Sequence, residues 1–138
     1  MKDLITRSRI AKLAASGAAV AATVLLATPA SAATAISVTP SSGLSDGQTV
    51  SVTASGYTPG AAVNVGECAS ATVCSNDTKY LTADANGAVS VTLDVKKAFT
   101  AKDWSTGQEI NVDCAAVQCN ITAWEQTTGN TVQNISFN

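Results

Sequence analysis

Residues 89–95 read Val-Ser-Val-Thr-Leu-Asp-Val, an unbroken alternation of apolar and polar side chains. Successive side chains of a β-strand point to opposite faces, so this pattern predicts a strand with one buried and one exposed face. The same period of two recurs at residues 36–38, 49–54, 63–65, 110–113, 120–123 and 134–137, and more weakly at 80–83. Turn formers separate the runs, as at Pro59-Gly60 and in residues 84–87.

These runs define the expected fold class. No apolar period of 3.6 residues is sustained beyond residue 32, so no amphipathic helix is expected there. About seven or eight short strands, spaced roughly 8–12 residues apart, are typical of an antiparallel sandwich. The sequence therefore predicts an all-β, immunoglobulin-like fold in a single domain, without internal repeats.

The first 32 residues have the composition of an export signal. Four basic residues are followed by the apolar run of residues 13–28 and by Ala30-Ser31-Ala32; the basic residues are Lys2, Arg7, Arg9 and Lys12. This order predicts a secretory signal peptide at residues 1–32 and a mature domain at residues 33–138. The alternative is a membrane anchor, but the run is shorter than the roughly 20 apolar residues of a spanning helix. We expect a secreted protein without membrane attachment after cleavage.

Cleavage at this position changes the charge of the chain. The whole sequence has 8 basic and 10 acidic residues, and the leader contains four of the former and one of the latter. The mature domain keeps four lysines and nine acidic residues, a net charge of −5 (4 − 9). An acidic surface repels a phosphate backbone, so direct nucleic-acid binding is not expected.

Four cysteines, all in the mature domain, allow three disulfide pairings. The spacings C-x5-C and C-x4-C favour two local links, Cys68–Cys74 and Cys114–Cys119, in the oxidising environment outside the cell. A zinc site is the alternative use of such cysteines. The chain has no histidine and no C-x2-C pair, so no metal site is predicted.

The absence of histidine also bears on catalysis. It excludes Ser/His/Asp and Cys/His constellations and removes the usual general base. A hydrolase built on paired carboxylates is the remaining enzymatic alternative, with acids at Asp77, Asp84, Asp103, Glu109 and Asp113. Surface acids on an acidic domain are usually solvating groups. We therefore predict no enzyme activity, no catalytic residues and no catalytic cofactor.

Binding depends on large side chains, and only six aromatic residues are present. Phe137 alternates with Ile135 and is expected in the core. Trp104 lies in a polar, turn-rich stretch, where an indole can form the wall of an apolar pocket. Tyr80 follows the first cysteine pair closely. Trp124 ends a predicted strand, and it is interpreted equally well as a core residue or as the floor of a cleft.

Several motifs, in order along the mature domain, resemble those of the neocarzinostatin family, the secreted apoproteins that carry enediyne antibiotics. Residues 38–50 (VTPSSGLSDGQTV) resemble the family's opening strand and turn, and residues 65–68 (VGEC) resemble its V-G-Q-C. Residues 81–87 (LTADANG) and 95–99 (VKKAF) resemble V-T-A-D-A-N-G and V-R-R-S-F. Residues 112–114 with the C-x4-C spacing, and the ending ISFN, also match.

The resemblance implies a seven-stranded immunoglobulin-like barrel with a small lobe of hairpins, and disulfides Cys68–Cys74 and Cys114–Cys119. It places a ligand cleft between barrel and lobe. The ligand would be a small apolar enediyne chromophore, held non-covalently by a monomeric carrier that meets DNA only through this cargo. The candidate ligand-binding residues are Cys68, Cys74, Tyr80, Trp104, Asn120, Thr122 and Trp124.

The sequence also departs from the family pattern. Only five residues separate Cys68 from Cys74, the family's W-G before the third cysteine is Glu109-Ile110 here, and Trp124 replaces a residue that is usually small. Such an indole could fill the cleft. The alternative interpretation is therefore an exported immunoglobulin-like interaction module without cargo.

Overall fold

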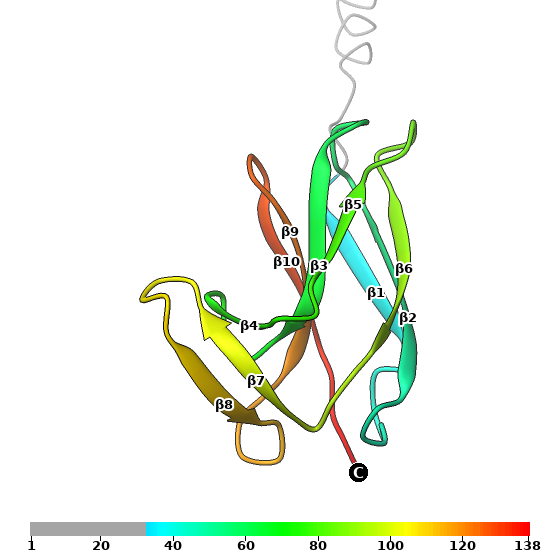
Figure 1. Cartoon of the computed structure of the whole chain (residues 1–138). Coiled ribbons are helices and arrows are strands. Elements are labelled where there is room, and N and C mark those ends of the chain that lie inside the picture. The colour runs from blue at the N-terminus through cyan, green and yellow to red at the C-terminus, as the bar shows by residue number, and fades with distance from the viewer. Residues whose placement is uncertain (1–32) are drawn as a thin grey trace, which may run out of the picture. The chain divides into compact units, whose positions relative to one another are not determined.

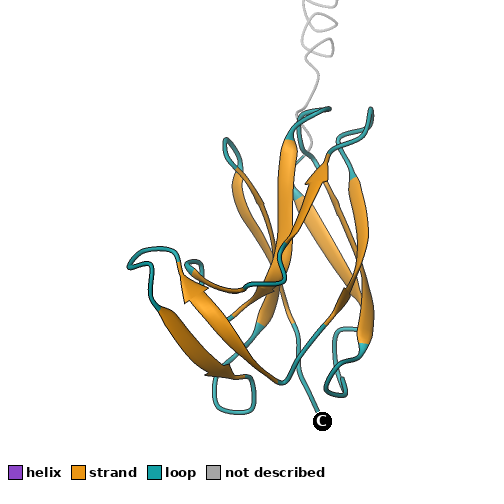
Figure 2. Ribbon diagram, viewed as in Figure 1, coloured by secondary structure: helices purple, strands orange, loops and turns teal. Residues whose placement is uncertain are grey.

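Residues 33–138 are described by the structure, a computed structural model, and they form ten β-strands and no helix (Figures 1 and 2). The predicted signal peptide lies outside the described residues. No helix long and apolar enough to cross a membrane is present in the described part of the chain. The strands are β1 (Ala35–Thr39), β2 (Thr49–Ser55), β3 (Ala62–Cys68), β4 (Val73–Ser75), β5 (Lys79–Thr82), β6 (Val89–Asp94), β7 (Ala98–Asp103), β8 (Glu109–Asp113), β9 (Asn120–Glu125) and β10 (Gly129–Asn134).

Seven of these strands form a sandwich. One sheet has the order β1-β2-β6, and the second contains β10-β9-β3 with β5 on the other side of β3. All pairs between these strands are antiparallel. The all-β, seven-stranded immunoglobulin-like class predicted from the sequence is confirmed.

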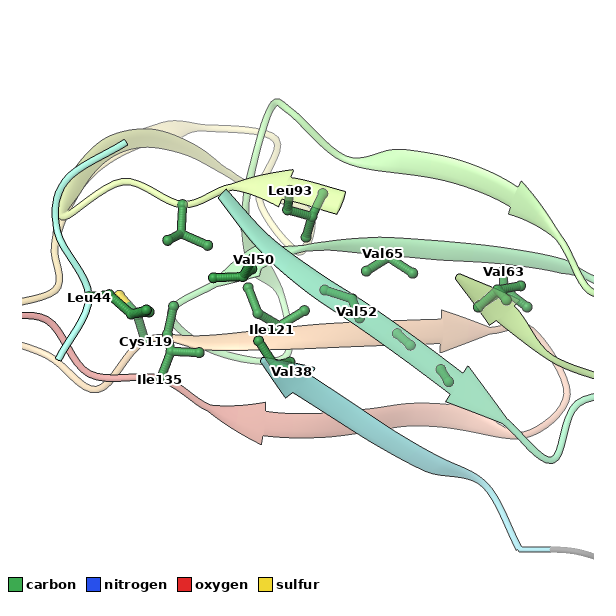
Figure 3. Close-up of a cluster of buried hydrophobic side chains, with 14 of the residues drawn as sticks. Val38, Leu44, Val50, Val52, Val63, Val65, Leu93, Cys119, Ile121 and Ile135 are labelled. Atoms are coloured by element: carbon green, nitrogen blue, oxygen red, sulfur yellow. The ribbon is translucent and has the colours of Figure 1, made fainter. Parts of the chain in front are cut away.

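The core lies between the two sheets, as period-two alternation requires. Along β2, exposed and buried residues alternate strictly, and Val50 and Val52 are almost fully buried. Val63 and Val65 of β3 and Ile121 of β9 meet them from the other sheet (Figure 3). On the opposite face of these two strands, Asn64 of β3 is half-buried and Trp124 of β9 is exposed, so part of this face remains accessible.

The remaining strands form a small lobe beside the sandwich. β4 pairs with β7, and β7 pairs with β8 (Figure 1). The lobe continues the larger sheet through a single residue pair between β3 and β4, Cys68 and Cys74, which are also linked by a disulfide. The second disulfide, Cys114–Cys119, lies in the connection from β8 back to β9. Both predicted pairings are confirmed.

Sequence patterning missed three strands and misplaced one. β4, β7 and β10 show no clean alternation, and the predicted strand at residues 134–137 is wrong because the sheet ends at Asn134. Beyond it, the Ser136 N–H donates to the Ser41 carbonyl oxygen at 3.0 Å, and Phe137 forms an isolated bridge with Leu44. Ile135 is buried and Phe137 packs against the core, so the apolar alternation of this tail reflects core packing rather than a strand ladder.

Candidate ligand-binding cleft

A cleft of about 520 Å³ lies between the outer face of the larger sandwich sheet and the lobe. Its floor comes from β3, β5, β9 and β10, and its wall comes from the β3–β4 turn, β4 and the β7–β8 turn. The lining residues are Asn64, Gly66, Cys68, Ala71, Cys74, Thr78, Tyr80, Trp104, Thr122, Trp124 and Asn130.

The strand period explains how β3 supplies the centre of the floor. Val63 and Val65 face the core, while Asn64, Gly66 and Cys68 between and after them line the cleft. Gly66 is the hollow in this row because it has no side chain. A Cβ atom built at this position would lie 3.0 Å from the Thr78 hydroxyl oxygen, so any larger residue would intrude on the floor.

The lobe holds Trp104 in place through the backbone of a tight turn. The Trp104 N–H donates to the Thr72 carbonyl oxygen at 2.8 Å, which ties the turn to the disulfide-closed β3–β4 loop. Asp103 accepts hydrogen bonds from the Ser105 hydroxyl at 2.6 Å and the Ser105 N–H at 2.9 Å, and these bonds lower the pKa of its carboxyl. The Lys102 ammonium lies 4.8 Å from the centre of the Trp104 ring. The indole therefore lies on an ordered turn.

The β9–β10 turn is ordered by a single carboxylate. Glu125 Oε2 accepts hydrogen bonds from the hydroxyl and N–H groups of both Thr127 and Thr128, at 2.6 to 3.0 Å. The Thr127 hydroxyl makes the largest contribution to lowering the pKa of Glu125 to about 2. This turn fixes the ends of β9 and β10, where Trp124 and Asn130 lie opposite each other.

Six of the seven residues predicted to bind ligand line this one cleft: Cys68, Cys74, Tyr80, Trp104, Thr122 and Trp124. Asn120 does not. It pairs with Cys68 at the start of β9, and its Oδ1 accepts a hydrogen bond from the Thr122 hydroxyl at 2.6 Å. Asn120 therefore supports Thr122 through this hydrogen bond and does not line the cleft itself.

Sequence reasoning missed five lining residues, Asn64, Gly66, Ala71, Thr78 and Asn130. Two of them could have been found. Once β3 is extended through residue 68, its alternation places Asn64 and Gly66 on the face opposite Val63 and Val65. Asn130 is the second residue of β10, a strand that the sequence patterning missed.

The structure also decides the role of Trp124. Its side chain is 43% exposed and lines the cleft, so it is not a core residue. Trp104 is 57% exposed and Tyr80 is 73% exposed, and both reach the same space. Three accessible aromatic rings thus surround a cavity that remains open with all of them in place.

The acids that were candidates for paired-carboxylate chemistry lie outside this lining. Three of them accept backbone N–H bonds within their own turns: Asp84 from Asn86 and Ala88, Asp103 from Ser105, and Asp113 from Ala115. These are turn-stabilising roles. Among the residues that line the cleft, the chemistry present is aromatic, hydroxyl, amide and disulfide, which suits non-covalent binding of an uncharged molecule.

One acid is buried on the opposite side of β3 from the cleft. Glu67 is 6% exposed, and burial raises the pKa of its carboxyl to about 7. One of its carboxylate oxygens lies within 4.8 Å of the sulfurs of Cys114 and Cys119. Those two sulfurs are bonded to each other, so they are not thiolate ligands for a metal ion.

Fold and cleft together define an immunoglobulin-like sandwich with a disulfide-anchored side lobe and an open aromatic cleft between them. Residues 36–138 match the model of the neocarzinostatin family. The chain belongs to this family.

Relatives of known name agree with this assignment. The chain is 41% identical over 96 residues to the antitumor antibiotic C-1027 apoprotein of Streptomyces globisporus, covering 67% of each chain. It is 36% identical over 108 residues to macromomycin of Streptomyces macromomyceticus, covering 74% of this chain and 75% of the relative. The solved structure of macromomycin superimposes with a TM-score of 0.71 over 77% of this chain and all of its own, at 35% identity. Apokedarcidin gives a TM-score of 0.62 over 78% of this chain and all of its own, at 28% identity.

Proposed function

We propose that this protein is a secreted carrier that binds, stabilises and delivers an enediyne-type antibiotic chromophore without covalent attachment. The observation that carries the proposal is the open cleft lined by Tyr80, Trp104 and Trp124 in a member of this family. One relative is named as an antibiotic apoprotein, which supports a small-molecule cargo.

The cleft has the size and lining that such a role requires. Its volume of about 520 Å³ lies within the usual range for small-molecule sites. Burial of an apolar ligand between the aromatic rings is favoured by the hydrophobic effect and removes the ligand from water. The ligand-binding residues in this proposal are the six predicted residues that line the cleft, with Asn120 supporting Thr122.

The protein itself acts without enzyme activity or a catalytic cofactor in this proposal. A monomer suffices, because every lining residue comes from one chain. The net charge of −5 expected for residues 33–138 disfavours direct contact with DNA, so the cargo alone attacks DNA.

Export is part of the same proposal, because a carrier delivers its cargo outside the producing cell. We infer that residues 1–32 are removed on secretion. Sequencing the N-terminus of the protein from culture medium should give a chain that starts at or within two residues of Ala33. Retention of Met1 or of the basic segment would contradict the inference.

Purification from the native culture provides the central test. Mass spectrometry of the protein under non-denaturing conditions should show a co-purifying small molecule, which denaturation then releases. The recombinant protein should bind an enediyne chromophore with quenching of tryptophan fluorescence, and the Trp104→Ala variant should bind it more weakly. Absence of a co-purifying molecule together with no enediyne binding would contradict the carrier role and favour an interaction module without cargo.

A further inference from the structure

Four cleft residues form one row across four adjacent strands. Asn130 of β10 lies opposite Trp124 of β9, Trp124 lies opposite Asn64 of β3, and Asn64 lies opposite Tyr80 of β5. Directly opposed residues of antiparallel strands have Cβ atoms about 4.5–5.5 Å apart and share a face. The Trp124 indole is therefore flanked on both sides by a primary amide.

These two amides have hydrogen-bonding groups available to a ligand. Both side chains line the cleft, and no side-chain hydrogen bond among the described residues involves the Asn64 or the Asn130 amide. Each amide offers two N–H donors and one acceptor oxygen. A ligand that covers these amides displaces the water bound to them. If it does not replace those hydrogen bonds, its binding free energy becomes less favourable, so the row favours ligands with complementary polar groups at their edge.

The charge of the row adds a second criterion. The row consists of two amides, an indole and a phenol, and no acidic or basic residue is among the residues that line the cleft. A charged ligand would lose hydration on entering without gaining a counter-ion from this lining. The indole of Trp124, 43% exposed, offers an apolar aromatic surface for stacking.

We propose that this row selects an uncharged planar ring system that stacks on Trp124 and bonds through edge carbonyl or N–H groups to Asn64 and Asn130. The inference rests on the proposed carrier function and names the part of the cargo that the sandwich side of the cleft recognises. Asn64 and Asn130 are the specificity-determining residues, and Trp124 is the stacking platform.

Three two-ring probes of similar size test the inference. 2-Quinolone is neutral and has an edge N–H and carbonyl, naphthalene lacks polar groups, and 2-naphthoate is an anion. Calorimetric titration should give the tightest binding to 2-quinolone. Asn64→Leu and Asn130→Leu, which nearly preserve side-chain shape, should each weaken 2-quinolone binding about fivefold or more. Both variants should leave naphthalene binding within about twofold, and Trp124→Ala should weaken the binding of both neutral probes.

Asn134→Leu is the matched control, because Asn134 is an exposed residue on the same face of β10 but outside the cleft lining. It should leave all three affinities unchanged. Unchanged 2-quinolone affinity in both asparagine variants, equal or tighter binding of 2-naphthoate, or no binding of 2-quinolone to the wild type would overturn the inference. An enediyne chromophore titrated in parallel separates the two proposals. If it binds while the probe pattern fails, only this inference falls; if it also fails to bind, the carrier function falls as well.

Discussion

The Glu67 carboxylate on β3 accepts a hydrogen bond from the backbone N–H of Lys96 at 2.9 Å, across 29 residues of sequence. Asp46 accepts the next N–H, that of Lys97, at 2.8 Å. Two acids from different parts of the sandwich thus hold consecutive residues of the link between β6 and β7. This link leads from the sandwich into the lobe, so the position of the cleft wall depends on it.

Glu67 should make stability fall as the pH rises above 4.5. Burial raises its pKa from 4.5 to about 7, so the folded state binds this proton more tightly than the unfolded state does. The stabilisation is therefore complete below pH 4.5 and is lost as the pH rises through 7. Glu67→Gln keeps an oxygen acceptor for Lys96 and cannot ionise. Urea unfolding at pH 4.5, 6 and 8 should show the wild type losing about 2 kcal/mol relative to this variant.

The pKa of Glu125 does not interfere with the pH experiment. Glu125 has its pKa lowered to about 2, so its contribution is present above pH 4.5 and is lost only as the pH falls towards 2. The stabilisation from Glu125 is therefore nearly constant in the tested window. Parallel stability profiles for wild type and Glu67→Gln between pH 4.5 and 8 would contradict the assignment.

A large side chain at Gly66 should weaken ligand binding strongly and leave the fold intact. Gly66 lies in the middle of β3 on the cleft face, and Leu at this position would project from the floor past the Thr78 side chain. Gly66→Leu should lower chromophore affinity by at least about tenfold by steric clash. Circular dichroism should show an unchanged β spectrum. Ser51→Leu, an exposed position on β2 away from the cleft, should bind normally.

Both disulfides should contribute to stability, but only Cys68–Cys74 should contribute to ligand binding. Each closes a short loop, so removing either pair as a double Cys→Ala variant should lower the free energy of unfolding by about 2 kcal/mol. Loss of Cys68–Cys74 frees the only residue pair between β3 and β4, which attaches the cleft wall, and should also weaken chromophore binding about tenfold. Loss of Cys114–Cys119 should leave affinity nearly unchanged. Equal affinities in the two variants, measured under conditions where both are folded, would contradict this division.

The buried face of β9 should dominate the stability of the sandwich. Ile121 is fully buried in the core, and Ile121→Ala should destabilise the protein by about 2–5 kcal/mol because it leaves a cavity. Val132→Ala on β10, where the side chain is 49% exposed, should cost less than about 1 kcal/mol. Chemical denaturation gives the free energy of unfolding of each variant. Similar losses in the two variants would contradict the dominant role of the buried face of β9.

Most strands of the sandwich could be predicted from the sequence, whereas two of the three lobe strands, β4 and β7, could not. β2 and β6 have alternating patterns because their inner faces pack into one core. β4 has only three residues, so burial imposes little pattern on it. β8 is the exception in the lobe, because residues 110–113 alternate although four of its five side chains are exposed. The candidate site could likewise be predicted only in part. Its aromatic residues were conspicuous in the sequence, whereas Asn64 and Asn130 became site residues only through their partners across the sheet.

The sequence by itself determined the all-β class, the local cysteine pairs and the family resemblance, because alternation and short spacings are local properties of a chain. Only the tertiary structure decided that Trp124 is accessible rather than buried. It also decided that Trp104, 20 residues away in sequence, lines the same cleft. The reason is physical: an indole at the end of a strand suits a core or a surface equally well, and only the register of β9 with β3 and β10 fixes the face on which it lies.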